Sequence, residues 1–373
     1  MKRFENIPEY SLRIEFLPYL IQCYDLISKT VVCSRNYTNK IADIERENFN
    51  KFRILDAKGN IIDIVQIDLV SERSKAATGA QYIRDLYMDA PNHGYYVGTY
   101  EIGEFSLLQD ENLIIKKSYP LKYCSKGYVT SENVFYLGVR ESETFDGPHS
   151  HYLAKIAWNK KEEPSLLWKK DVPSSIMGIV QIKNHIYVGL RTGDLQIWDI
   201  TTDKFIKNIH IFHNPLSIIE LGFGKIIATS WKGEIASISP EGDIHWMTSF
   251  SGEKIETILE DDTKIIGTDI KGHYFQLNPK TGLIIKRGLW DLISVRNATI
   301  ASNLIIFRDW FVLTGYGGVW AFWDKDYNTI FHHYLEDPLI RRLCLHPLGL
   351  ITGDDTGYLR FWKIGGIRSA YQV

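Results

Sequence analysis

The C-terminal half of the chain repeats one order of hydrophobic and polar positions. Five segments share it, and they span 185–200, 225–240, 264–279, 310–325 and 349–364. Each begins with a continuous apolar run, continues through a polar turn closed by glycine, and ends in an alternating run. Glycine supplies the positive φ that a tight hairpin turn needs, and alternation places every second side chain on one face of a sheet. The pattern therefore predicts antiparallel pairs of strands.

The turn glycines set the register of these repeats. They are Gly193, Gly233, Gly272, Gly318 and Gly357, at spacings of 40, 39, 46 and 39 residues. A bulky apolar residue stands five positions after each glycine, at Trp198, Ile238, Leu277, Trp323 and Trp362. A second turn and a further short strand follow, as at 239–242 and 278–282. With the apolar run that precedes each unit, every repeat has four strands, which we name a to d.

Four strands about every 40 residues are typical of one blade of a β-propeller. Looser copies of the repeat extend into the N-terminal half. We therefore predict an all-β protein in which 1–373 is a single propeller domain of four-stranded antiparallel blades. Eight blades are expected, or seven if the first copy is divided too finely. The expected blades span 20–67, 80–119, 121–170, 176–211, 215–250, 254–289, 299–335 and 339–364.

The last copy needs a partner for its final strand, because few residues follow Trp362. We expect the N-terminal run at 10–16 to supply the missing strand. Such a closure locks the ring and leaves no free sheet edge. Residues 366–373 are the alternative source of this strand.

Two segments, 343–363 and 186–206, resemble WD40 repeats. Trp198-Asp199 and Trp323-Asp324 match the dipeptide that names that family. The turns at 239–242 and 278–282 are more similar to those of quinoprotein-like propellers. The Gly-His pair that WD40 repeats usually carry is missing in register, so the resemblance is to a divergent member. It implies the propeller fold, and a fold alone does not determine function.

Composition and charge narrow the classes of partner. The chain is 45% hydrophobic and 13% aromatic, which suits strands. Its net charge of −2 disfavours direct binding of nucleic acid. No apolar run has the length of a signal peptide core or a membrane span. The four cysteines, Cys23, Cys33, Cys124 and Cys344, form no CxxC pair and suit a reducing compartment. We expect a cytoplasmic protein without a membrane partner.

Motifs of catalysis are missing from the sequence, among them GxSxG, HExxH and the P-loop. We therefore predict no catalytic residues, no cofactor and no small-molecule substrate. The sharpest chemical candidate is His149 with His151, because an HxH pair on an extended chain points both rings to one side. A metal site would need a third ligand from Asp146, Glu141 or Glu143. An exposed polar loop explains the same residues, so we assign no metal ligand.

The longest departures from the repeat gather on one predicted face. Residues 36–49 and 140–150 extend b–c turns, and 71–80 and 289–299 extend d–a connections, which emerge on the same side of a propeller. Loops on a rigid scaffold are where binding concentrates. The turn residues and loop histidines expected there as protein-binding groups are Arg191, Trp231, Lys271, Tyr316, Asp355, His149 and His151.

These observations predict a non-catalytic interaction scaffold that is a subunit of a larger complex. Tyr, Trp and Arg are the residues that most often anchor protein interfaces. The alternative is a propeller enzyme of the hydrolase, lyase or lactonase kind, with a metal or carboxylate site near the central channel. Such a site would draw ligands from several blades and leave no local motif. Stoichiometric metal in the purified protein would favour the enzyme.

Overall fold

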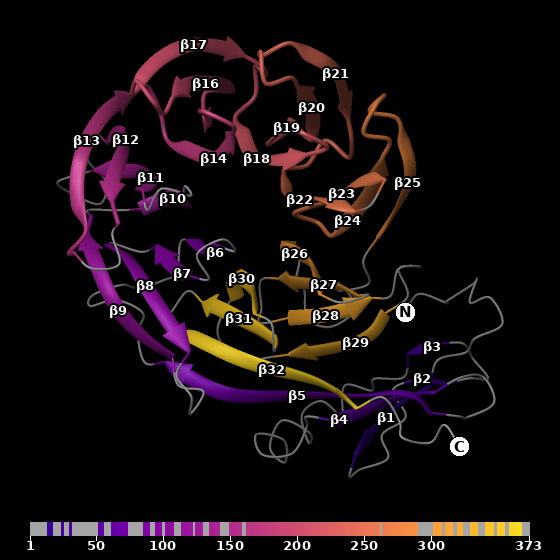
Figure 1. The fold of residues 1–373 in the computed structure, drawn as a ribbon. Helices are drawn as coiled ribbons and strands as arrows, with labels where there is room; N and C mark the ends of the chain where they lie inside the picture. The colour runs from indigo at the N-terminus through magenta and orange to yellow at the C-terminus, as the bar shows by residue number, and fades with distance from the viewer. Residues whose placement is uncertain are drawn as a thin grey trace.

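The computed structural model is all-β, and its strands form antiparallel sheets arranged in a ring (Figure 1). It describes the backbone of the strands named below. It describes side chains at 118–121, 134–141, 149–158, 162–261 and 263–289 and at parts of 303–314 and 340–363. Within these residues, no helix is long and apolar enough to cross a membrane.

Six sheets around the ring have four strands each, in chain order. The first ring sheet consists of β6 (Asp85–Asp89), β7 (Gly94–Gly98), β8 (Glu101–Leu107) and β9 (Leu113–Pro120). The second consists of β10 (Cys124–Val129), β11 (Val134–Glu141), β12 (Ser150–Ala157) and β13 (Ser165–Val172). The third consists of β14 (Ile176–Ile182), β15 (His185–Leu190), β16 (Asp194–Asp199) and β17 (Lys204–His210).

The next three ring sheets repeat this plan. The fourth consists of β18 (Leu216–Gly222), β19 (Lys225–Ser230), β20 (Glu234–Ile238) and β21 (Ile244–Ser249). The fifth consists of β22 (Ile255–Asp261), β23 (Lys264–Asp269), β24 (His273–Leu277) and β25 (Ile284–Leu289). The sixth consists of β26 (Ala301–Phe307), β27 (Trp310–Gly315), β28 (Val319–Trp323) and β29 (Thr329–Tyr334).

A seventh sheet joins the two ends of the described chain, and we call it the closing sheet. Its strand order is β1 (Arg13–Leu17), β4 (Lys51–Leu55), β5 (Ile61–Arg73), β32 (Leu359–Ile367), β31 (Gly349–Asp354) and β30 (Ile340–His346). Two short strands, β2 (Tyr24–Asp25) and β3 (Thr30–Val31), pair only with each other among the described residues.

The first strand of each ring sheet contacts the first strand of the next. These contacts run through β6, β10, β14, β18, β22, β26 and β30, and β30 contacts β6 again. The a strands therefore lie innermost, and the d strands lie at the rim, as Figure 1 shows for β17 and β21. The described strands thus make a closed circle of seven sheets, which is the propeller arrangement that the repeats predicted.

The expected eighth blade is not formed by the described strands. The first copy, at 20–67, was predicted to fold as its own blade, but β4 and β5 belong to the closing sheet. The prediction ended the last strand of that copy at residue 67, whereas β5 continues to Arg73. Its length lets it pair with β4 along one edge and with β32 along the other. The expected insertion at 36–49 lies outside the described residues, between β3 and β4, which belong to different sheets.

The strand that closes the ring also differs from the expectation. Residues 10–16 were predicted to complete the last blade. Instead, β5 pairs with β32, from Ile64 opposite Ile367 to Arg73 opposite Leu359. The N-terminal strand β1 pairs with β4, two strands farther out in the same sheet. A longer strand offers more backbone hydrogen bonds to the open edge of β32, so β5 occupies it.

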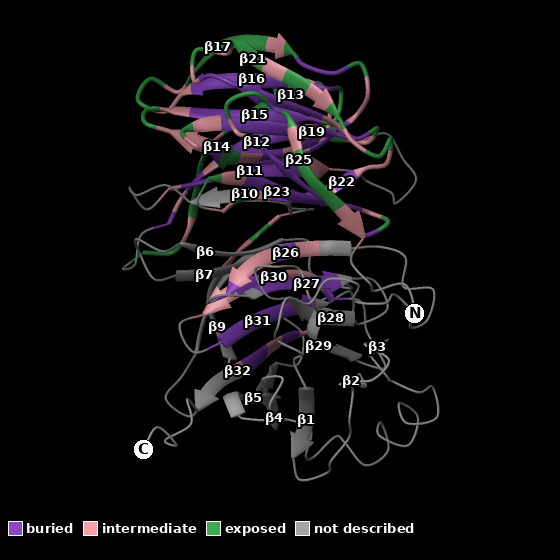
Figure 2. Cartoon of the chain, turned by 90° about the vertical axis from the view of Figure 1, so that its right-hand side faces the viewer, coloured by how far each residue is buried: buried purple, intermediate pink, exposed green. Residues whose placement is uncertain are grey.

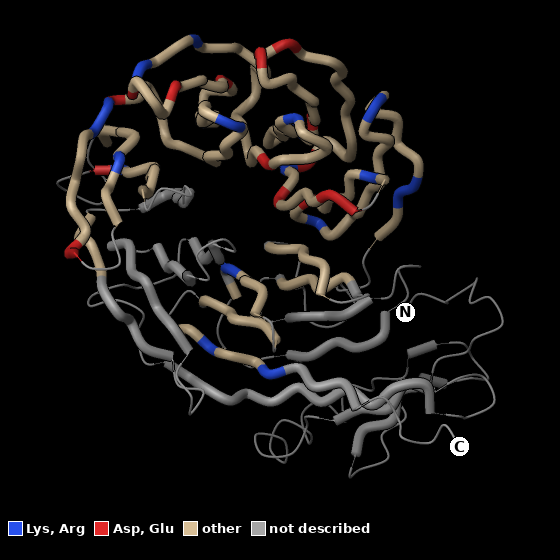
Figure 3. The backbone as a smooth tube through the Cα atoms, viewed as in Figure 1, with Lys and Arg blue, Asp and Glu red and all other residues tan. Residues whose placement is uncertain are grey.

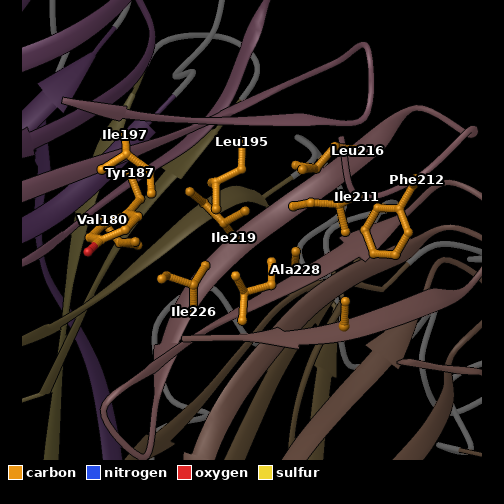
Figure 4. Close-up of a cluster of buried hydrophobic side chains, with 12 residues drawn as sticks. Val180, Tyr187, Leu195, Ile197, Ile211, Phe212, Leu216, Ile219, Ile226 and Ala228 are labelled. Carbon is orange, nitrogen blue, oxygen red and sulfur yellow. The ribbon is translucent and has the colours of Figure 1, made fainter. Parts of the chain in front are cut away.

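The hydrophobic core lies between neighbouring sheets. All residues of β15, β19 and β23 except the first are buried, because each of these strands is covered on both faces. Figure 4 shows one cluster, in which Val180, Tyr187, Leu195 and Ile197 of the third sheet meet Leu216, Ile219 and Ile226 of the fourth. Figure 2 shows the contrast with the rim, where β17 and β21 are largely exposed.

Hydrogen bonds also link neighbouring sheets, and they connect specific residues across each junction. The Tyr187 hydroxyl donates to the carbonyl of Pro240 in the next sheet at 2.8 Å. One sheet farther on, Trp246 Nε1 donates to the carbonyl of Pro279 at 2.9 Å. Both prolines lie in the second turns that the sequence pattern identified. An aromatic donor of one sheet is therefore matched to the c–d turn of the next.

The turn glycines have the backbone conformation that the pattern requires. Gly193, Gly233 and Gly272 have φ values of 90°, 73° and 80°, so this prediction is confirmed for them. Gly318 and Gly357 lie outside the described residues. A Cβ atom at Gly193 would stand 2.0 Å from the backbone oxygen of Phe212, whereas one at Gly224, with φ of 71°, would meet nothing within 4 Å.

This contrast gives a matched pair of variants. Gly224→Ala adds only the strain of a left-handed alanine, and we expect it to lower the free energy of unfolding by about 1 kcal/mol. Gly193→Ala adds a clash with backbone, and we expect a further loss of about 1–3 kcal/mol. Urea denaturation of the two variants beside the wild type measures the difference. Equal losses would contradict the close approach at Gly193.

The aspartate of the Trp198-Asp199 dipeptide holds the c–d turn of its sheet. Its Oδ1 accepts hydrogen bonds from Thr201 Oγ1 at 2.6 Å, Thr201 N at 2.8 Å and Thr202 N at 2.9 Å. These bonds favour the ionised carboxyl, the one from the Thr201 hydroxyl most strongly. They lower the pKa of Asp199 from 3.8 to about 2.

The lowered pKa makes the contribution of Asp199 dependent on pH. The folded pKa lies below the unfolded value, so the stabilisation is fully present above about pH 4 and is lost as the pH falls toward 2. We expect the difference in free energy of unfolding between the wild type and Asp199→Asn to shrink over this range. Urea denaturation at several pH values measures it, with Asp243→Asn, an exposed carboxyl in the next sheet, as control. A difference that stays constant with pH would refute this role.

Candidate functional site

The b–c turns and d–a connections share one side of the ring, which we call the b–c face. Backbone hydrogen bonds fasten each described turn to the connection that precedes its own sheet. Arg191 N donates to Ser175 O at 2.8 Å, Trp231 N to Pro215 O at 2.8 Å, and Ile270 N to Lys254 O at 2.9 Å. Arg191, Trp231 and Ile270 are therefore equivalent positions, and Lys271 lies one residue farther along its turn.

Side chains at the ends of the b strands also shape these turns. Ser230 Oγ accepts hydrogen bonds from the backbone N–H groups of Lys232 and Glu234, each at 3.1 Å. The buried Asp269 does the same for Lys271 and His273, each at 2.9 Å. The turns are thus held from both sides, which limits how far the residues they carry can move.

Arg191 and Trp231 come into direct contact across the junction of two sheets. The Arg191 guanidinium carbon lies 4.7 Å from the centre of the Trp231 ring. The ammonium of Lys254, from the connection before the next sheet, lies 5.4 Å from the same centre. Cations at these distances are attracted by the negative face of an indole. Trp231 is half-buried, and its Nε1 has no hydrogen-bond acceptor among the described residues.

A second group of side chains lies on the other side of Arg191. His151 Nδ1 is 3.4 Å from the hydroxyl of Ser175, the residue whose carbonyl accepts the Arg191 N–H. The ring centre of His149 is 6.4 Å from that of His151, and Arg140 donates to His149 Nε2. Burial, followed by the positive charges of Arg140, His149 and Arg191, holds the pKa of His151 below its usual 6.5.

Other cations on the b–c face have carboxylate partners. Lys271 Nζ lies 2.5 Å from Glu253 Oε1, and this contact raises the pKa of Lys271 and lowers that of Glu253. Lys254 Nζ lies 2.7 Å from Glu256 Oε1, and His210 Nδ1 lies 3.0 Å from Asp194 Oδ1. Figure 3 shows both signs of charge distributed around the described part of the ring. Within that part, no carboxylate pairs with Arg191.

The structure brings together four of the seven residues that the sequence selected. Arg191 and Trp231 touch, His151 contacts Ser175, whose carbonyl accepts the Arg191 N–H, and His149 lies beside His151. Lys271 belongs to a separate ion pair, and Tyr316 and Asp355 lie outside the described residues. Most of the predicted loop segments at 71–80, 140–150 and 289–299 also lie outside them. Ser175 and Lys254 were missed, although the residues of the d–a connections could have been searched together with the turns. Arg140 lies within the predicted loop segment 140–150 but was not selected.

The described residues contain no group of three or more His, Cys, Asp or Glu side chains that could hold a metal ion. Of the third ligands proposed for the histidine pair, Glu143 and Asp146 lie outside the described residues. Chemically, the site offers fixed positive charge from Arg191, two imidazoles and an aromatic face. These groups suit the binding of an anion or of a protein surface.

No protein-family model matches the chain, and no curated protein matches it. Its fold resembles 1545 chains of known structure. One of them is the computationally designed Ika8 protein, in a crystal structure of its packing No. 1 in P63. The match has 12% sequence identity and a TM-score of 0.57, and covers 79% of this chain and 99% of that one. At this identity the likeness concerns the fold alone, so function has to be argued from the site.

The position of Arg191 beside His151 can be tested by titration. We expect His151 to titrate below pH 6.5, and Arg191→Gln to move its pKa upward, because one positive charge is removed. NMR of the imidazole protons, assigned with the His151→Gln variant, measures both values. Lys280→Gln, which removes an exposed charge from the opposite face, should leave the pKa of His151 unchanged. A pKa that does not respond to Arg191→Gln would contradict this geometry.

Proposed function

We propose that this chain is a non-catalytic interaction scaffold and a subunit of a larger complex, with the b–c face as its binding surface. The observation that carries the proposal is the contact of Arg191 and Lys254 with the ring of Trp231. Arginine and tryptophan dominate the binding energy of protein interfaces. Here they stand together on turns whose backbones are fastened to the adjoining connections.

The preorganisation of these turns supports the proposal. Binding costs less when the contacting side chains are already ordered. The mutual contact of Arg191 and Trp231 restricts both side chains before a partner arrives. The half-buried state of Trp231 leaves part of its ring surface for a partner, and the exposed Arg191 stands beside it.

We further propose that the chain is a divergent relative of the WD40 and quinoprotein-like propellers and acts in the cytoplasm. The Trp198-Asp199 dipeptide supports the relation, because its aspartate caps the c–d turn and its tryptophan is buried against the neighbouring sheet. A location in a reducing compartment agrees with the four cysteines and the missing CxxC pair.

Purification of the tagged chain from its native host tests the scaffold function. We expect a stoichiometric protein partner to co-purify with the wild type and to be reduced at least about tenfold with Arg191→Ala/Trp231→Ala, the loss expected when interface anchors are removed. Lys204→Ala/Lys280→Ala removes two exposed cations near the opposite face and should retain the partner. Circular dichroism and thermal unfolding confirm that each variant is folded.

Two outcomes would overturn the proposal. One is a wild-type chain that purifies without any stoichiometric protein and carries a metal ion or small molecule, which would favour the propeller enzyme. The other is a partner that is retained equally by both double variants, which would place the interface away from the b–c face.

A further inference from the structure

Two arginines and two histidines lie around the junction of the second, third and fourth ring sheets. Arg140 and His149 are in contact, and His151 adjoins Ser175, whose carbonyl binds the backbone of Arg191. These groups come from β11, from β12 and the residue before it, and from the turn after β15. Three elements therefore direct cationic or protonatable side chains toward one region of the b–c face.

Arg191 differs from the neighbouring basic side chains in the partner that it contacts. Lys254, Lys271 and His210 each lie within 3.0 Å of a carboxylate oxygen. Arg191 has no such partner among the described residues, and its guanidinium rests on Trp231 instead. A guanidinium in that position keeps its hydrogen-bond donors for an incoming group, because contact with a ring face does not use them.

Donors without acceptors mark the same region. Nδ1 of His149 and Nε1 of Trp231 are buried and have no hydrogen-bond partner among the described residues. Since Arg140 donates to Nε2 of His149, the neutral ring carries its proton on Nδ1. Buried donors left without acceptors are unfavourable. A ligand rich in oxygen acceptors would supply partners of the kind that these donors lack.

Resting on the interaction role argued above, we propose that His149, His151, Arg191 and Trp231 form a binding surface for an acidic segment of a partner protein. One aspartate or glutamate carboxylate pairs with Arg191, where two parallel hydrogen bonds are possible. The histidines contact a second carboxylate. The ring of Trp231 packs against the carbon atoms of the segment between its charges.

The charge distribution favours a short acidic segment over a long polyanion. The positive region is bounded by carboxylates on the same face, among them Asp194, Glu234, Glu253 and Glu256. A nucleic acid strand that crossed the face would meet these groups, and the whole chain has a net charge of −2. A segment with only a few carboxylates fits within the region.

Binding should strengthen as the pH falls. The charges that face His151 from the neighbouring elements are Arg140, His149 and Arg191, and all of them oppose its protonation. A bound carboxylate reverses this field and favours the imidazolium form. By linkage, the affinity for the acidic segment then increases between pH 7.5 and about pH 5.5.

Fluorescence anisotropy tests the surface on the purified full-length chain. The probe is a fluorescein-labelled peptide of alternating aspartate and serine residues, and the reference peptide carries asparagine in place of aspartate. We expect only the aspartate peptide to bind at low salt, with an affinity that falls as salt is added. Arg191→Gln should weaken this binding about tenfold. The matched control Lys280→Gln should not change it.

The histidines supply a readout that a merely structural role would not affect. In His149→Gln/His151→Gln, the increase of affinity toward low pH should disappear while binding through Arg191 persists. The inference fails if the asparagine peptide binds equally well, if Arg191→Gln binds like the wild type, or if single-stranded DNA of equal charge binds more tightly than the peptide. It also fails if the wild type does not bind the peptide.

These failures differ from a failure of the scaffold function. A native partner that is lost with Arg191→Ala/Trp231→Ala, together with no binding of the aspartate peptide, would retain the interface and reject its acidic occupant. Peptide binding without any co-purifying partner would retain the anion-binding surface and reject the stable complex.

Discussion

Apolar packing between neighbouring sheets is the interaction on which the rest of the structure depends. A single four-stranded sheet has two apolar faces and cannot bury either alone. The clusters around Tyr187, Trp198 and Phe275 each draw on two consecutive sheets, so every sheet is stable only between its neighbours. Burial of each large apolar side chain contributes about 1.5–3 kcal/mol. The hydrogen bonds of Tyr187 and Trp246 to proline carbonyls then match one sheet to the turn of the next.

Because each sheet depends on its neighbours for burial, the first and last sheets of the ring must also be in contact. The pairing of β5 with β32 joins the two ends, since it brings a strand from the first fifth of the chain to the edge of the last described strand. The contact of β30 with β6 then places the closing sheet against the first ring sheet. Each described ring sheet therefore has a neighbour on both sides, and this closed ring is the frame that positions the b–c turns.

The proposed binding surface follows from this frame. Packing between sheets sets the separation of consecutive b–c turns. Backbone hydrogen bonds from Arg191, Trp231 and Ile270 hold each turn against the connection that precedes its sheet. Residues on separate sheets can then act as one group, as the guanidinium of Arg191 does with the ring of Trp231. Carboxylates pair with Lys254 and Lys271, whereas the guanidinium of Arg191 has no carboxylate partner among the described residues and rests on Trp231. For the proposed binding surface, a single unpaired guanidinium favours a ligand with few, closely placed negative charges.

By itself, the sequence determined the features that depend on neighbouring residues. The four-stranded repeats, the hairpins closed at Gly193, Gly233 and Gly272, and the location of Arg191 and Trp231 in b–c turns all follow from local φ preferences and side-chain alternation. Only the tertiary structure decided which sheet β4 and β5 join, because edge pairing is a competition between strands far apart in the chain. It also decided that Arg191 lies on Trp231, that Lys254 lies beside the same ring, and that Arg140 contacts His149. Those contacts arise where separate strands and sheets meet, and no local pattern records how they are placed.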